Sequence, residues 1–135
     1  MTFQYMLDTN VVSALIREPR GTAARRVRSV GDRRLCCSVI VAGELRFGVA
    51  NRGSDKLRQR VEDVLAHISV LPLTDSTDDI YGQIRDHLKR MGTPIGSNDF
   101  WIAAHALHEG LTLVTANIDE FHRVPGLSVE NWEIG

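Results

Sequence analysis

The chain has 135 residues, of which 43% are hydrophobic, and its formal net charge is -1. This length suits a single domain spanning residues 1–135 with a core of its own, and the apolar content excludes a disordered protein. The near-neutral charge excludes a uniformly basic, histone-like binder of nucleic acids, although a local basic patch stays compatible with it.

Three local features indicate a cytoplasmic protein that does not enter a membrane. Cys36 and Cys37 are neighbours, so a disulfide between them would be strained, and a reducing compartment is expected. The first residues, MTFQYMLDTN, lack the basic and apolar regions of a secretory signal. No segment reaches the ~20 apolar residues that a membrane helix needs.

Hydrophobic periodicity and turn residues predict strands that alternate with helices. In chain order, we expect a strand at 3–7, a helix at 11–18, a short basic helix at 22–30, a strand at 35–38, a helix at 39–50, amphipathic helices at 57–68 and 80–91 with a strand at 70–73 between them, an apolar helix at 98–109, a strand at 111–115 and an edge strand at 127–129.

This alternation predicts an α/β fold, with a central parallel sheet of four to five strands and helices on both faces. Ligands bind at the carboxyl ends of the strands in such sheets. Thr9 or Asn10 is expected to cap the first helix at that edge, and Ser38 is expected to cap the helix at 39–50.

Three acidic residues stand in otherwise apolar sequence, namely Asp8 in YMLDTNVV, Glu44 in SVIVAGELRFG and Asp99 in PIGSNDFWIAAHAL. A carboxylate among apolar neighbours loses hydration free energy unless it is paired, and three that converge would repel one another. A divalent cation would stabilise them. Ligands that are oxygens alone favour Mg²⁺, with Mn²⁺ as a substitute, over zinc.

Each of these acids also has a purely structural explanation. Asp8 alone fits a helix cap, Asp99 alone fits a partner of a helix dipole, and Glu44 could pair with the nearby Arg46. All three explanations would have to hold at once, so the metal site is the better interpretation of the set.

The motifs around the three acids resemble those of PIN-domain nucleases, and within them those of the VapC toxins of bacterial toxin–antitoxin pairs. The resemblance runs from Tyr5 to Trp132 through YMLDTNVVSALI, SVIVAGELRFGV, GTPIGSNDFWIAAHAL and LTLVTANIDEFHRVPGLSVENW. DTN alone would be a weak signal, but the four motifs in this order are highly specific. The resemblance implies a PIN-like (Rossmann-like) three-layer sandwich.

The resemblance also implies roles for individual residues. The positions that match the family's acidic metal ligands are Asp8, Glu44 and Asp99. At the fourth acidic position many members carry Asp, whereas this chain has Asn117, so Asp119 or Glu120 is expected to supply the charge, with Glu120 the better match and a fourth catalytic acid. Supporting hydrogen bonds are expected from Asn10, Thr115 and Asn117.

The implied activity is that of a toxic endoribonuclease, which hydrolyses RNA phosphodiester bonds with Mg²⁺. The seven arginines between Arg17 and Arg34 are the candidate RNA-binding patch, or else a solvated helix face, and tRNA is a substrate known in the family. The implied partners are an inhibitory VapB-type antitoxin and a second copy of the chain in a homodimer. Promoter DNA would be bound only through the antitoxin.

A non-catalytic PIN-like module that binds RNA or protein is the alternative. Such a module would be expected to have lost one of the three core acids, and this chain retains all three.

Overall fold

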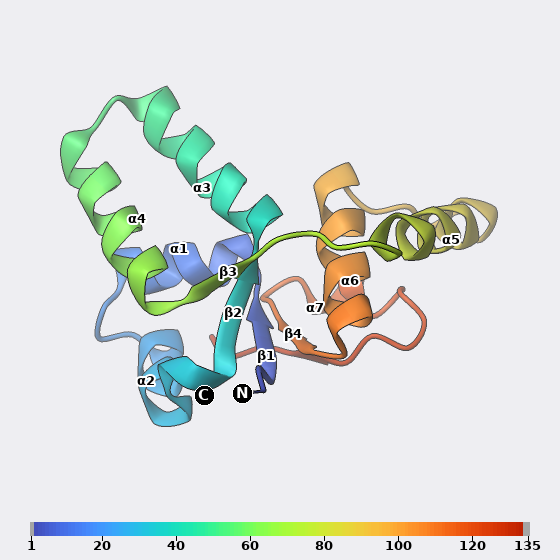
Figure 1. Ribbon diagram of the computed structural model, residues 1–135, viewed down its shortest axis with the longest axis horizontal. Helices are drawn as coiled ribbons and strands as arrows, with labels where there is room; N and C mark the ends of the chain where they lie inside the picture. The colour runs from blue at the N-terminus through green and yellow to red at the C-terminus, as the bar shows by residue number, and fades with distance from the viewer. Residues whose placement is uncertain (1, 134–135) are drawn as a thin grey trace.

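Five short parallel strands form the centre of the computed structural model, which describes residues 2–133 (Figure 1). Their order across the sheet is β3-β2-β1-β4-β5, so β1 lies in the middle. Their bounds are Tyr5–Leu7 for β1, Leu35–Ser38 for β2, Ser69–Leu71 for β3, Thr112–Val114 for β4 and Val129–Glu130 for β5. The predicted parallel sheet is confirmed.

Helices flank the sheet, with α1 to α4 on one side of Figure 1 and α5 to α7 on the other. The pair α3 and α4 packs together and extends away from the strands, and α5 packs on α6. Their bounds are Thr9–Arg17 for α1, Thr22–Val30 for α2, Val39–Arg52 for α3, Asp55–His67 for α4, Thr77–Arg90 for α5, Ser97–Glu109 for α6 and Ile118–Phe121 for α7, with a 3₁₀ turn at Asp32–Arg34. The predicted α/β layers are confirmed.

Specific residues set three of the helix ends. The Ser38 hydroxyl accepts a hydrogen bond from the Ile40 N–H at 3.1 Å, which caps α3 as expected. Gly53 ends α3 and Gly110 ends α6, each in the left-handed conformation that glycine adopts without a steric penalty.

Of the residues that could cap α1, the structure selects Asp8. Asp8, rather than Thr9 or Asn10, is the last extended residue, and its carboxylate accepts a hydrogen bond from the Thr9 N–H at 2.8 Å. The helix therefore starts directly where β1 ends. Asp8 caps the helix and also stands at the carboxyl edge of the central strand.

Other boundaries also shift. The third strand ends at Leu71, since Pro72 has no N–H to continue the ladder, and the edge strand lies at 129–130 rather than 127–129. The single-turn helix α7 is not foreseen, because four residues carry no readable periodicity.

Trp132 anchors the C-terminal segment to the central strand. Its side chain is 2% exposed, and its ring meets Tyr5 of β1 edge-on with 4.9 Å between centroids. The indole N–H donates to the Glu130 carboxylate at 2.9 Å, and Arg26 lies over the ring. β5 is thereby held against β4 at the edge of the sheet.

No helix within residues 2–133 is both long enough and apolar enough to cross a membrane.

Replacing Trp132 with Ala should lower the free energy of unfolding by about 3–5 kcal/mol, because a large buried ring leaves a cavity. Trp132→Phe should cost only about 1 kcal/mol beyond small packing losses, since a ring still faces Tyr5 while one hydrogen bond is lost. Urea unfolding measures both. Similar small losses for the two variants would contradict this role of the ring.

Candidate active site

Asp8 stands at the carboxyl end of the central strand β1 and is only 3% exposed. One carboxylate oxygen accepts from the Thr9 N–H at 2.8 Å. The other accepts from the Thr115 hydroxyl at 2.7 Å and from the Asn10 amide at 3.3 Å. Burial raises the pKa of Asp8, and the bonds from Thr115 and Thr9 oppose that rise. The carboxylate is therefore held in one orientation by donors on both sides.

The polar residues around Asp8 also join two turns of the chain. Thr115 follows β4 and is fully buried, and its hydroxyl accepts a hydrogen bond from the Asn117 N–H at 3.0 Å. The Asn10 side-chain oxygen accepts from the Ala116 N–H at 3.3 Å. The turn after β1 and the turn after β4 are thus tied together at the edge of the sheet where the strands end.

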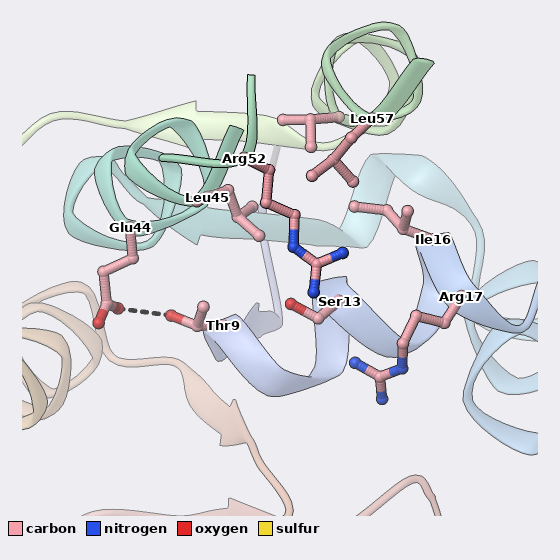
Figure 2. Close-up of a pocket in the computed structure, with 10 residues that line it drawn as sticks. Thr9, Ser13, Ile16, Arg17, Glu44, Leu45, Arg52 and Leu57 are labelled. Atoms are coloured by element: carbon pink, nitrogen blue, oxygen red, sulfur yellow. Dashed lines mark hydrogen bonds between the residues drawn. The ribbon is translucent and has the colours of Figure 1, made fainter. Parts of the chain in front are cut away.

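Glu44 lies in the second turn of α3 and is half-buried. Its carboxylate accepts a hydrogen bond from the Thr9 hydroxyl at 2.6 Å (Figure 2) and one from the Asn98 amide at 3.4 Å. Arg46 forms an ion pair with Glu62 of α4. The structure therefore directs Glu44 toward Asp8 and α6, and the structural alternative of a Glu44–Arg46 pair is wrong.

Asp99 lies in the first turn of α6, with its carboxylate folded back over Gly96. A Cβ at Gly96 would stand 3.1 Å from an Asp99 oxygen. Burial raises the pKa of Asp99 to about 7, and the charges of Asp8, Glu120 and Glu44 contribute to that rise in this order. The Glu120 carboxyl is also within hydrogen-bonding reach of it. Three acids from separate parts of the chain, Asp8, Glu44 and Glu120, therefore repel the ionised form of Asp99.

The fourth acidic position has three candidates, of which Glu120 faces the other acids. Its charge raises the pKa of both Asp8 and Asp99, and its side chain is half-buried in α7. Asn117 and Asp119 are exposed. The single turn of α7 thus directs Glu120 inward and Asp119 outward.

The carboxylates converge without enclosing a finished ion cage. Between residues 2 and 133, no three Asp, Glu, His or Cys side chains already stand in an arrangement that would hold a metal ion. Glu44 is bonded to Thr9 and Asn98 instead. The donors nevertheless suit a hard divalent cation, because they are oxygens alone and because a positive charge would relieve the repulsion that raises the pKa of Asp99.

The arginines between Arg17 and Arg34 do not form one patch beside these acids. Arg33 and Arg34 precede β2, so they lie at the edge of the sheet opposite to the carboxylates. Arg28 donates to a backbone carbonyl at 2.9 Å. Of these seven arginines, Arg17 lines a groove that also contains Glu44. The same groove contains Arg52, which the sequence did not single out.

The chain is similar to known proteins over nearly its whole length. The PIN domain family matches residues 5–127. Ribonuclease VapC2 of Rickettsia felis is 36% identical over 131 residues, covering 96% of this chain and 98% of the relative. The tRNA(fMet)-specific endonuclease VapC of Salmonella typhimurium is 35% identical over 130 residues, with 96% and 98% covered. A crystal structure of VapBC2 from Rickettsia felis, bound to a DNA fragment from its promoter, matches with a TM-score of 0.87 at 32% identity, covering 98% of this chain and 99% of that chain.

The raised pKa of Asp99 predicts a pH-dependent stability of the metal-free protein. Because this pKa rises from 3.8 to about 7 on folding, the folded state binds more protons in that window, and its stability falls as the pH rises through it. Asp99→Asn removes that loss. The variant should be more stable than the parent by about 1–2 kcal/mol at about pH 8, after discounting for partial exposure, and by less at about pH 4.5.

Urea unfolding in the presence of a chelator, at the two pH values, measures this difference. Asp119→Asn is the matched control, because that carboxylate is exposed and should show no such pH-dependent gain. A gain for Asp99→Asn that is the same at both pH values would contradict the repulsion described here.

Proposed function

We propose that this chain, which belongs to the PIN domain family and within it to the VapC ribonucleases, cleaves RNA as the toxin of a toxin–antitoxin pair. The observation that carries the proposal is the convergence of Asp8, Asp99 and Glu120 at the carboxyl ends of β1 and β4. Glu44 faces the same place from α3. Residues 1–135 would form one PIN domain.

PIN-domain ribonucleases generally depend on a divalent metal ion. Here we propose Mg²⁺, with Mn²⁺ as a substitute, held by Asp8, Asp99 and Glu44, with Glu120 completing the catalytic acids. When bound, such an ion supplies an activated water and positive charge for the phosphate undergoing hydrolysis. The all-oxygen donor set and the crowding of negative charge around Asp99 support this assignment.

The surrounding residues prepare the acids for this task. Thr115 and Asn10 fix the Asp8 carboxylate, so its orientation does not depend on the ligand. Burial and the neighbouring charges raise the pKa of Asp99 to about 7, so a cation bound here would favour loss of its proton. The Thr9 hydroxyl holds Glu44 at the entrance, at 2.6 Å. Rigid placement of reacting groups is one of the largest sources of catalytic rate enhancement.

Partners and substrate follow by likeness to the matched proteins. We propose a VapB-type antitoxin that inhibits the enzyme, since the Rickettsia felis structure is a VapBC2 complex on promoter DNA. DNA would be contacted through the antitoxin, and the toxin would form a homodimer in the cytoplasm. The Salmonella typhimurium relative is named for tRNA(fMet), which makes tRNA a candidate substrate class for this chain.

Asp8→Asn and Asp99→Asn should each reduce Mg²⁺-dependent RNA cleavage by at least about 100-fold while leaving the protein folded, because each removes a charged ligand. Growth arrest on expression should disappear with it. Sequencing of RNA ends in cells after a pulse of expression measures whether RNA is cut and identifies which RNA is cut. Full cleavage by the Asp99→Asn protein would contradict the assignment. So would the absence of RNA cleavage in cells that express the wild-type protein.

Glu120→Gln tests the fourth position separately. It should weaken Mg²⁺ binding and lower the cleavage rate by about tenfold, since it removes a charge that acts on Asp8 and Asp99 without removing a principal ligand. Asp119→Asn, one residue away and exposed, is the matched control. Unchanged metal affinity and rate in Glu120→Gln would exclude Glu120 from the site.

A further inference from the structure

A groove of about 230 Å³ leads away from the acidic site between α1, α3 and α4 (Figure 2). Thr9 and Glu44 lie at one end of the groove, Arg17 lies toward the other end, and the Arg52 side chain reaches from α3 over Ser13 between them. We propose that these two arginines bind a backbone phosphate of single-stranded RNA, farther along the strand than the phosphate that is cleaved. This inference rests on the proposed function and adds a binding site to it.

The two helices carry matched series of residues along the groove. Thr9 and Arg17 are eight residues apart on α1, and Glu44 and Arg52 are eight residues apart on α3. Eight residues of α-helix rise by about 12 Å, and residues four apart share a face. On each helix the backbone of the arginine is thus about 12 Å from that of the residue beside the acids, so we expect the scissile phosphate beside Glu44 and the second phosphate beside the two arginines.

The middle of the groove combines apolar side chains, such as Leu45 and Leu57, with the Ser13 hydroxyl and the Arg52 guanidinium. Ser13 lies between Thr9 and Arg17, and Figure 2 shows Arg52 reaching from the end of α3 toward it. On the α3 side the corresponding residue is Gly48, where a Cβ would meet no atom within 4 Å. Packing therefore does not require glycine there, although glycine inside a helix is less favourable than alanine. Gly48 leaves this part of the α3 surface without a side chain beside the groove.

The two guanidinium groups are available to an anion. Arg17 and Arg52 are exposed, and neither forms a salt bridge with any described residue, whereas the neighbouring Arg46 and Arg58 pair with acids on α4. The planar guanidinium donates two parallel hydrogen bonds to a phosphate. Two such groups in the groove, beyond the Glu44 carboxylate, favour a phosphate beside them.

An acidic segment of an antitoxin is the competing ligand for the same arginines. RNA is favoured because the groove is continuous with Glu44, so a strand whose scissile phosphate lies at the acids has a direct path along it. Binding of the antitoxin is therefore measured alongside binding of RNA.

The test uses a single-stranded oligoribonucleotide that the wild-type protein cleaves. Arg17→Gln and Arg52→Gln together should lower kcat/KM by tenfold or more at low salt. In the inactive Asp99→Asn background they should also flatten the dependence of log binding constant on log salt, by about 0.7 for each phosphate that the protein no longer neutralises. The double substitution Arg33→Gln and Lys89→Gln removes the same charge elsewhere on the surface and should leave both quantities near wild type.

A scan with neutral methylphosphonate linkages locates the phosphate. In the wild-type protein, one linkage away from the scissile bond should weaken binding, and the same linkage should have no further effect in the Arg17→Gln, Arg52→Gln protein. If no linkage shows this dependence, or if the control charge removal has an equal effect, the phosphate site is refuted while RNA cleavage itself stands. Unchanged RNA binding with weakened binding of the cognate antitoxin would also overturn it, and would assign the arginines to that protein.

Discussion

The buried carboxylate of Asp8 is the constraint on which the site depends. It ends the central strand, starts α1, and is almost sealed from solvent. An ionised group there is stable only with donors around it, and the Thr9 N–H, the Thr115 hydroxyl and the Asn10 amide supply them. Those same bonds tie the turns after β1 and β4, so the edge of the sheet is built around one acid.

The other acids add repulsion that the fold tolerates for the sake of function. Asp99 feels the charges of Asp8, Glu120 and Glu44, which together with burial bring its pKa to about 7. In the proposed metal site a divalent cation would offset this repulsion, and its binding would then be coupled to release of a proton. The groove toward Arg17 and Arg52 separates negative from positive charge in the same region, which suits a polyanion that must be positioned before it is cut.

Much of the fold could be predicted from the sequence because the local signals agree with the final packing. The strand at 35–38 and the basic helix at 22–30 have the predicted bounds, since Gly21 and Gly31 flank the helix and charged residues precede the strand. For the cap of α1, both Thr9 or Asn10 and their neighbour Asp8 fitted the sequence, and the structure has Asp8. The sequence alone cannot tell whether the last extended residue is Asp8 or its neighbours.

The parts of the site that the sequence left open depend on side-chain direction. Only the phase of the single turn α7 decides that Glu120 faces the acids while Asp119 faces solvent. Because seven arginines are close in sequence, one basic patch was expected. The sheet instead separates Arg34 from the carboxylates, and Arg52 of α3, remote in sequence, shares a groove with Glu44. Partners across the fold, such as Thr115 for Asp8, were suggested by family resemblance rather than by any local pattern.

The claim that crowded carboxylates await a divalent cation is tested most directly by calorimetric titration of Mg²⁺ into the metal-free protein. The titration is carried out at about pH 6.5 in two buffers of different ionisation enthalpy. Binding of Mg²⁺ should release a substantial fraction of one proton, and this release should be lost in the Asp99→Asn protein. Binding without proton release, or release that persists unchanged in Asp99→Asn, would contradict it.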